Sequence, residues 1–165
     1  HSLEAIAISR GTSEFCGKIG QTVASELVTA FDDAGHPGLW GSINIDDEGM
    51  PAGRRLLIEN GVLKGYLIDK FYGRKLGLES NGAGRRQDYT YMPAPRMSNT
   101  YIAAGKSEPE EIIAATAYGL YAKELSGGSV NTTTGEFNFA VDEAYLVRDG
   151  KIAEQVKGAR LIAKG

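Results

Sequence analysis

Residues 54–69, RRLLIENGVLKGYLID, indicate the fold class of this chain. Two apolar runs flank Asn60 and Gly61, and an Asn-Gly pair favours the positive backbone angles of a type I′ turn. The stretch therefore predicts a β-hairpin. Leu56 and Ile58 are expected on one face of its first strand, because side chains alternate between the two faces of a strand.

A second hairpin of the same kind is predicted near the end of the chain. Residues 145–148 and 151–155 flank Asp149 and Gly150, which again suit a type I′ turn. Further strands are predicted where apolar residues alternate or run together, at residues 24–31, 42–46, 137–141 and 161–165. Roughly seven strands with one or two helices predict an α+β fold with a largely antiparallel sheet.

Helical signals are fewer. Residues 1–8 read as the end of an amphipathic helix, and residues 69–78 as a short helix. One long helix is predicted to begin at Ser107, because Ser107 and Glu110 have the spacing of a capping box. That helix is expected to end at Gly119 or shortly after it.

Composition narrows the class of protein. A chain of 165 residues fits a single domain, residues 1–165. Its formal net charge is −3 and no block of five like charges occurs, so no direct nucleic-acid partner is expected. No apolar run approaches the roughly 20 residues of a membrane helix, so no membrane partner is expected. One cysteine and no signal peptide favour a cytoplasmic location.

The two ends of the chain predict a fragment of a larger protein. The chain lacks an initiator methionine, and residues 1–7 look like a helix already under way. Residues 161–165 look like a strand in mid-course. His1 itself is either native or a leftover tag residue.

Residues 81–102, NGAGRRQDYTYMPAPRMSNTYI, form a long irregular stretch. Such stretches inside compact chains are usually functional or disordered, and the aromatic residues argue against disorder. We interpret it as an ordered loop that presents Arg85, Arg86 and Arg96 to a ligand. The alternative is a surface excursion packed by its own tyrosines. Its last residues, 99–102, predict the start of a strand.

A complete catalytic set is absent from the sequence, which has no H-E-x-x-H, C-x-x-C or G-x-S-x-G motif. The acidic residues 46–48 are either a hard-cation site or a solvated turn. Cys16 could be a thiolate ligand or nucleophile, but it is interpreted as a small buried or half-buried residue. His36 is interpreted as a surface residue.

Several motifs in order resemble the TldD/PmbA family, whose members are also called modulators of DNA gyrase or peptide-maturation proteins. They are RGTSEFCGKIGQTVASELVTAFDD, GSINIDDEGMP, LLIENGVLKGYLID, NGAGRR, MPAPRMSNTYI and GKSEPEEII, and the match covers essentially the whole chain. The resemblance implies a zinc metallopeptidase that cleaves small, unfolded or extended peptides. Its metal site is His-Glu-x-x-x-His followed, well downstream, by a cysteine ligand.

The resemblance assigns one zinc ligand to this chain. The second histidine of the family is followed by one residue and then Leu-Glu, which matches His1-Ser2-Leu3-Glu4. The first histidine and the catalytic glutamate would precede His1, and the cysteine ligand would follow residue 165. Cys16 does not match that cysteine. No catalytic residue is therefore expected in this stretch, which alone is expected to be inactive.

The substrate is predicted to bind the stretch 81–102. An extended peptide can add to an exposed strand edge, and residues 99–102 are predicted to form or adjoin that edge. Arg85, Arg86 and Arg96 would face the cleft, where a guanidinium can hold a carboxylate; structural ion pairs are the alternative. The predicted substrate-binding residues are Arg85, Arg86, Arg96, Asn99, Thr100 and Tyr101.

The resemblance also implies a homodimer or a heterodimer with a paralogous subunit. A non-catalytic, peptide-binding partner subunit is the alternative to the peptidase itself.

Overall fold

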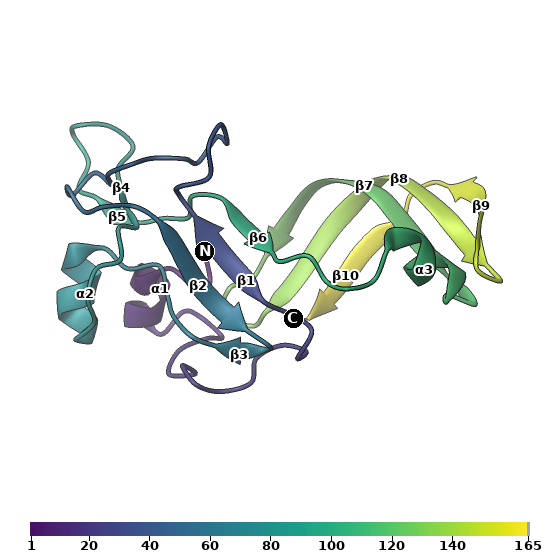
Figure 1. Cartoon of the computed structure of the whole chain (residues 1–165), viewed down its shortest axis with the longest axis horizontal. Helices are drawn as coiled ribbons and strands as arrows, with labels where there is room; N and C mark the ends of the chain where they lie inside the picture. Colours follow the sequence, from purple (N-terminus) through teal and green to yellow (C-terminus); the bar gives the residue numbers. More distant parts are fainter. Residues whose placement is uncertain (165) are drawn as a thin grey trace. The chain divides into compact units, whose positions relative to one another are not determined.

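The computed structural model describes residues 1–164, which divide into two compact units. An N-terminal unit covers His1–Ala104 and a C-terminal unit begins at Gly105 (Figure 1). Every paired strand in both units is antiparallel, and the three helices are short. The α+β class with a largely antiparallel sheet is confirmed. The single-domain assignment stays a prediction, and each unit is described by itself.

The N-terminal unit is built on a four-stranded sheet in the order β3-β2-β1-β6 (Figure 1). Its strands are β1 (Ala30–Asp33), β2 (Arg54–Glu59), β3 (Val62–Leu63) and β6 (Thr100–Ile102). A separate two-stranded ladder joins β4 (Gly84–Arg85) to β5 (Ala94–Pro95). Strand β6 is therefore the last strand on its side of the sheet among the described residues.

The hairpin of β2 and β3 is confirmed. Asn60 and Gly61 have φ angles of 47° and 79°, as a type I′ turn requires. The returning strand is shorter than predicted and ends at Leu63. Beyond it, Leu67 forms a parallel bridge with Glu4, so the chain leaves the hairpin to contact the N-terminal segment.

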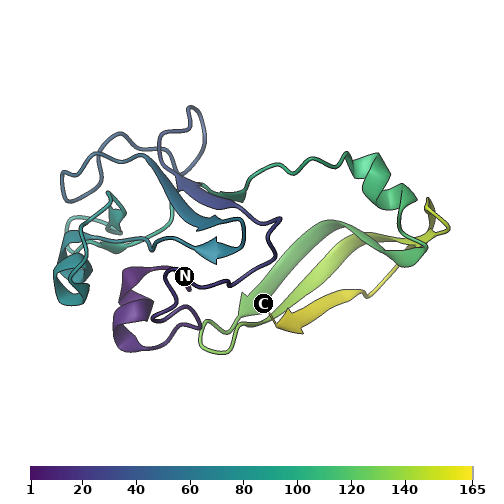
Figure 2. The same cartoon turned by 60° about the horizontal axis from the view of Figure 1, so that its bottom comes forward.

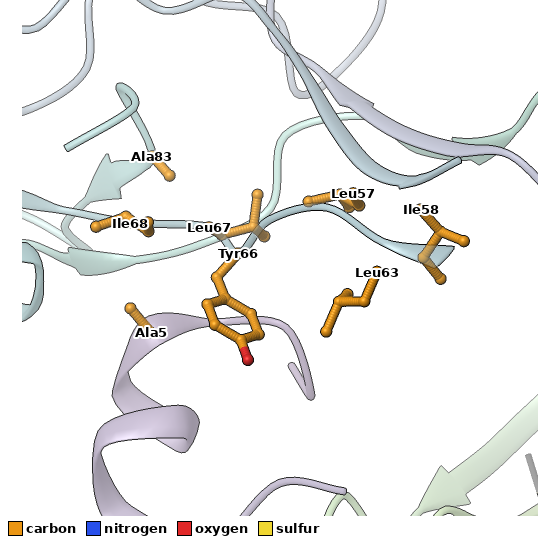
Figure 3. Packing of buried hydrophobic residues seen from close by; sticks show 8 residues of the cluster. All are labelled: Ala5, Leu57, Ile58, Leu63, Tyr66, Leu67, Ile68 and Ala83. Carbon is orange, nitrogen blue, oxygen red and sulfur yellow. The ribbon is translucent and has the colours of Figure 1, made fainter. Parts of the chain in front are cut away.

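The core of this unit combines residues of the hairpin with residues that precede and follow it in the chain (Figure 3). Its buried members are Ala5, Leu57, Ile58, Leu63, Tyr66, Leu67, Ile68 and Ala83. The ring of Tyr66 points toward helix α1, and its hydroxyl donates to the Phe15 carbonyl at 2.7 Å. Fully burying one large apolar side chain contributes about 1.5–3 kcal/mol, so this cluster supplies much of the stability of the unit.

Two helices lie side by side in the same unit (Figure 2). Helix α1 spans Ala5–Arg10 and helix α2 spans Lys70–Leu76. The α2 prediction is confirmed, because the Asp69 side chain accepts from the Tyr72 amide and Gly77 ends the helix in the left-handed region. Helix α1 begins later than predicted, after a turn over residues 1–4.

Two predicted strands are wrong. Residues 24–29 form turns and β1 begins only at Ala30, which leaves the Leu27 side chain 84 % exposed. Residues 42–46 contain an isolated bridge between Ile45 and Pro51 rather than a strand. The Asp46 carboxylate there accepts from the amides of residues 48 and 50, so a turn competes with extended backbone.

The C-terminal unit is a short helix followed by a second antiparallel sheet (Figure 2). Helix α3 spans Pro109–Ala114, and the strands are β7 (Tyr118–Val130), β8 (Glu136–Arg148), β9 (Lys151–Val156) and β10 (Arg160–Lys164). Strand β8 pairs with the other three strands. The second hairpin is confirmed, with φ angles of 46° at Asp149 and 74° at Gly150.

The predicted long helix is wrong in its length and its cap. Helix α3 has six residues, and the Glu111 carboxylate accepts from the Glu108 amide at 3.0 Å in place of the Ser107–Glu110 pair. Gly119 lies in β7, opposite Val147 of β8. Pairing with β8 therefore overrides the helical spacing of the apolar residues after Ala114.

In residues 1–164, no helix combines the length and apolar character that a membrane span needs.

Candidate functional site: an edge strand beside an arginine-lined groove

Strand β6 presents backbone groups on its open side. The amide of Asp33 donates to the carbonyl of Asn99, and the amide of Ala103 donates to the carbonyl of Thr29. Bonded pairs alternate in an antiparallel ladder, so residues 99, 101 and 103 direct their backbone groups toward β1. The amides and carbonyls of Thr100 and Ile102 consequently face away from the sheet, and the Ile102 side chain is 67 % exposed.

A buried carboxylate holds β6 in place. Asp32 of β1 is fully buried, and its Oδ1 accepts from the Ser98 amide and the Thr100 hydroxyl, both at 2.8 Å. Its Oδ2 accepts from the Ser98 hydroxyl at 2.6 Å and from Nη1 of Arg55 at 2.7 Å. A charged acceptor with four donors is a strong anchor, so the segment entering β6 is rigidly positioned.

The partner of that carboxylate fixes the other end of the long loop. Nε of Arg55 donates to the Asn81 carbonyl at 2.8 Å, and Nη2 donates to the Gly82 carbonyl. The Asp32–Arg55 pair therefore holds both the start and the end of residues 81–102. This supports the interpretation of an ordered loop.

Two of the acidic residues 46–48 also hold this loop, and the third binds the start of helix α2. Oδ2 of Asp46 accepts from the Gly84 amide at 3.0 Å, and Oδ2 of Asp47 accepts from the Arg86 amide at 2.8 Å. Oε2 of Glu48 accepts from the Lys70 amide at 2.6 Å. The sequence left open a hard-cation site or a turn at residues 46–48. These bonds favour the turn, because the carboxylates accept from backbone amides.

The side chains of three predicted substrate-binding residues are engaged within the unit. The Asn99 amide group donates to the Asp33 carbonyl at 2.7 Å and accepts from the Gly41 amide at 3.0 Å. The Thr100 hydroxyl binds Asp32, and the ring of Tyr101 lies 5.8 Å from that of Phe31. The open backbone groups of β6 and the exposed Ile102 side chain are left to meet a substrate. Substrate binding itself stays a prediction.

The three predicted arginines come together in one groove, which we call the arginine groove. It has a volume of about 750 Å³ and is lined by Trp40, Gly41, Arg85, Arg86, Gln87, Tyr91, Met92, Ala94, Arg96, Met97 and Ser98. Within residues 1–164, Arg85 and Arg86 form no ion pair. The structural alternative therefore does not describe these two side chains, although their ligand stays a prediction.

Arg96 links the groove to His1. Its Nη1 lies 3.2 Å from Nδ1 of His1 and 3.7 Å from Oε1 of Glu4. Nδ1 of His1 also lies 3.2 Å from both carboxylate oxygens of Glu4. Glu4 is only 4 % exposed, and this burial raises the pKa of its carboxyl, while Arg96 opposes the rise. Arg96 thus combines a groove position with a partial ion pair.

His1 has the surroundings of a single metal ligand. A carboxylate on Nδ1 leaves Nε2 as the nitrogen that can bind a metal, and ligand histidines commonly have such a carboxylate partner. The His1 side chain is more than half exposed, so that nitrogen is accessible. No group of three or more His, Cys, Asp or Glu residues within 1–164 is placed to hold a metal. Any metal bound at His1 would need ligands from elsewhere.

Cys16 does not contribute to this site. It is half-buried, and its Sγ lies 3.6 Å from the Ile8 carbonyl. This agrees with a packed residue.

Comparison with known proteins gives the family. A profile described as the PmbA/TldA metallopeptidase C-terminal domain matches residues 1–164. The chain belongs to the PmbA/TldD metallopeptidase family. The resemblance inferred from the sequence motifs is therefore confirmed.

Relatives and a solved structure agree with this assignment. The metalloprotease TldD homolog of Buchnera aphidicola subsp. Acyrthosiphon pisum is 47% identical over 165 residues, which is 100% of this chain and 34% of that protein. The zinc metalloprotease TldD homolog of Saccharolobus solfataricus is 34% identical over 112 residues, covering 68% of this chain and 25% of that protein. The crystal structure of TldE from Thermococcus kodakarensis has a TM-score of 0.87 at 29% identity, covering 99% of this chain and 37% of that one. The chain thus spans about a third of the length of the first of these relatives.

Sequence reasoning missed the supporting residues of the site. Asp32 and Arg55 are 23 residues apart, and no local pattern shows that their side chains pair. Trp40 is a fully exposed aromatic in the groove, and no motif in the sequence points to it. Glu4 is the supporting residue that the sequence could have revealed, because it belongs to the His1-Ser2-Leu3-Glu4 match.

Proposed function

We propose that this chain forms part of a zinc metallopeptidase that acts on small, unfolded or extended peptides. The observation that supports it best is the open edge of β6, whose outward backbone groups lie next to a groove that reaches His1. The names of the relatives support a metalloprotease, and one of them names zinc. Because the chain spans about a third of such relatives, the activity belongs to the whole protein, and this stretch alone is proposed to be inactive.

In this proposal an extended peptide adds to β6 as a further strand. The amides and carbonyls of Thr100 and Ile102 would pair with the peptide backbone, which every sequence shares. Recognition through backbone groups suits peptides of varied sequence, whereas a folded protein already pairs its own backbone internally. The Asp32 anchor keeps β6 in place, so little ordering is required when the peptide binds.

His1 would hold the zinc through Nε2, with Glu4 orienting the imidazole from Nδ1. Bound zinc supplies a water of lowered pKa and polarises the peptide carbonyl. The remaining ligands and the catalytic glutamate would come from outside this stretch, as the resemblance implies.

The test uses the full-length protein and an unstructured peptide. We expect cleavage that a chelator abolishes and that added zinc restores, with products identified by mass spectrometry. Absence of metal-dependent cleavage would contradict the proposal.

A substitution of Ile102 tests the role of the β6 edge. Ile102→Pro removes an amide that faces away from β1, and proline is tolerated on the open side of an edge strand. We expect KM to rise by about tenfold, as the loss of one hydrogen bond of about 1 kcal/mol and of local fit would give. The matched variant Ile102→Ala keeps the amide and should leave KM nearly unchanged. Equal KM values for the two variants would exclude peptide addition at Ile102.

A second candidate is a non-catalytic, peptide-binding partner subunit of the same family. The close structural match to TldE supports it, since this fold occurs in proteins of both names. Metal analysis of the full-length protein separates the two candidates, because only the peptidase should contain stoichiometric zinc. We further propose a homodimer or a heterodimer with a paralogue, and a cytoplasmic location. Measurements of molecular mass in solution, with and without the paralogue, would test the proposed dimer.

A further inference from the structure

We propose that the arginine groove binds a carboxylate of the peptide held on β6, so that the protein selects acidic peptides. The inference rests on the proposed function, because it assumes a peptide on β6. It adds a chemical preference that backbone pairing alone cannot give.

The arginine groove is lined by positive charge. The groove is lined by three arginines and by no aspartate or glutamate, although the whole chain has a formal net charge of −3. Of the acidic side chains near these arginines, Glu4 pairs with Arg96. Two others accept from backbone or hydroxyl groups. Asp47 accepts from the backbone amide of Arg86, and Asp88 accepts from the amide and hydroxyl of Thr90 at 2.8 and 2.6 Å. Within residues 1–164 the guanidinium groups of Arg85 and Arg86 therefore form no ion pair, although Asp88 interacts electrostatically with Arg86 beyond ion-pair distance. An external carboxylate is the complementary ligand.

Rigidity is the second argument. Arg85 lies in β4 and is paired with Ala94 of β5, while the Arg86 amide is held by Asp47. The Gly84 amide is held by Asp46. Fixed backbone leaves only the side chains to be ordered on binding, and the planar guanidinium can bind a carboxylate through two parallel hydrogen bonds.

Position is the third argument. Ser98 lines the groove and stands two residues before Thr100, the first residue of β6. At about 3.3 Å per residue, a peptide extended along β6 would reach the groove within two or three residues. Arg96, which also lines the groove, contacts His1. A carboxylate bound there would lie close to the proposed metal ligand and hence close to the bond that is cut.

The neighbouring surface indicates what flanks the carboxylate. Trp40 is fully exposed, and Tyr91 and Met92 are exposed beside the arginines. Exposed aromatic and methionine side chains next to a charged pocket suit a bulky apolar residue adjacent to the acid. The carboxylate can come from a glutamate side chain or from the C-terminus of the peptide, and the two sources differ in the experiment below.

The test measures binding separately from cleavage. Metal-free, full-length protein is titrated into fluorescently labelled, unstructured peptides that differ at one group, and Kd is read from anisotropy. One pair carries Glu or Gln beside a leucine, with an amidated C-terminus. The other carries a free or an amidated C-terminus on the Gln sequence. We expect one carboxylate to lower Kd by about 10–100-fold, the range of a hydrogen bond to a charged group. The difference should shrink as salt is raised.

The variant Arg85→Ala/Arg86→Ala should remove this preference, so that Kd no longer differs within either peptide pair. Arg96 is left unchanged because it contacts Glu4 and His1. Lys75→Ala is the matched control, since it removes an exposed positive charge of α2 that does not line the groove. Equal Kd values within both peptide pairs, or a preference that survives in the double variant, would overturn the proposal.

Cleavage assays distinguish this inference from the proposed function. Acidic and neutral peptides could show chelator-sensitive cleavage at the same kcat/KM and the same Kd. That result would refute the carboxylate preference and leave the proposed peptidase activity intact. A preference in Kd without any metal-dependent cleavage would retain the groove and refute the peptidase.

Discussion

The pairing of Asp32 with Arg55 should be the most sensitive polar contact of the N-terminal unit. The Asp32 side chain is fully buried and that of Arg55 is 5% exposed, so neither charge can be solvated when the other is lost. Asp32→Asn keeps the shape but leaves Arg55 as a buried, uncompensated cation. Breaking a buried pair from one side costs about 3–5 kcal/mol. We therefore expect the free energy of unfolding to fall by that amount.

The measurement is urea denaturation of the full-length protein, combined with hydrogen exchange of residues 98–103. Exchange should accelerate at Ser98, whose amide donates to Asp32, and at Tyr101 and Ala103, which pair with β1 beyond that anchor. Glu59→Gln is the control, because the Lys64–Glu59 pair is about half exposed and should contribute no more than about 1 kcal/mol.

A double variant separates charge from packing. Asp32→Asn/Arg55→Met removes both charges, so its loss should be smaller than the sum of the two single losses by about 1–3 kcal/mol. A loss below about 1 kcal/mol for Asp32→Asn, or strict additivity in the double variant, would refute the argument that this pair positions β6.

Two further predictions concern carboxylates. Glu4→Gln in the full-length protein should weaken zinc binding by about 10–100-fold, because Gln orients the His1 imidazole less firmly; competition with a chromogenic chelator measures it, and an unchanged affinity would remove Glu4 from the metal site. Asp69→Asn should raise stability at neutral pH. Burial raises the pKa of the Asp69 carboxyl, so the folded state binds the carboxyl proton more tightly than the unfolded state does. The free energy of unfolding of the unchanged protein therefore falls as pH rises from the ordinary carboxyl range through the raised pKa. Asn remains a good N-cap for α2, so the variant keeps the cap without the buried charge. Its gain in stability should shrink as pH falls below the ordinary carboxyl range. A stability difference between variant and unchanged protein that is the same at pH 3 and pH 7 in thermal unfolding would contradict this.

Local signals in the sequence were enough for the hairpins and for helix α2. Asn60-Gly61 and Asp149-Gly150 adopt positive φ angles in both turns, a backbone region that few other residues accept. Asp69 and Gly77 delimit α2 through bonds to residues within one turn. The family motifs likewise sufficed to place the chain among the metallopeptidases.

Signals that depend on distant partners were misread. Residues after Ala114 have helical spacing, yet from Tyr118 onward they pair with β8, because the ladder supplies bonds that an isolated helix turn does not. The alternation at residues 42–46 likewise gave way to a turn held by Asp46. In both places a local pattern fitted two structures. Pairing with a distant strand chose between them after Ala114, whereas bonds within four residues of Asp46 did so at residues 42–46.

From its residues alone, the chain specifies its turns, its hairpins and its family, since each of these depends on neighbours in sequence or on a motif. Only the tertiary structure brings Trp40, Arg85 and Arg96 into one groove and sets Asp32 against Arg55. Those residues come from loops and strands that meet only when the sheet forms, and a buried charge can be paired only where the fold delivers its partner.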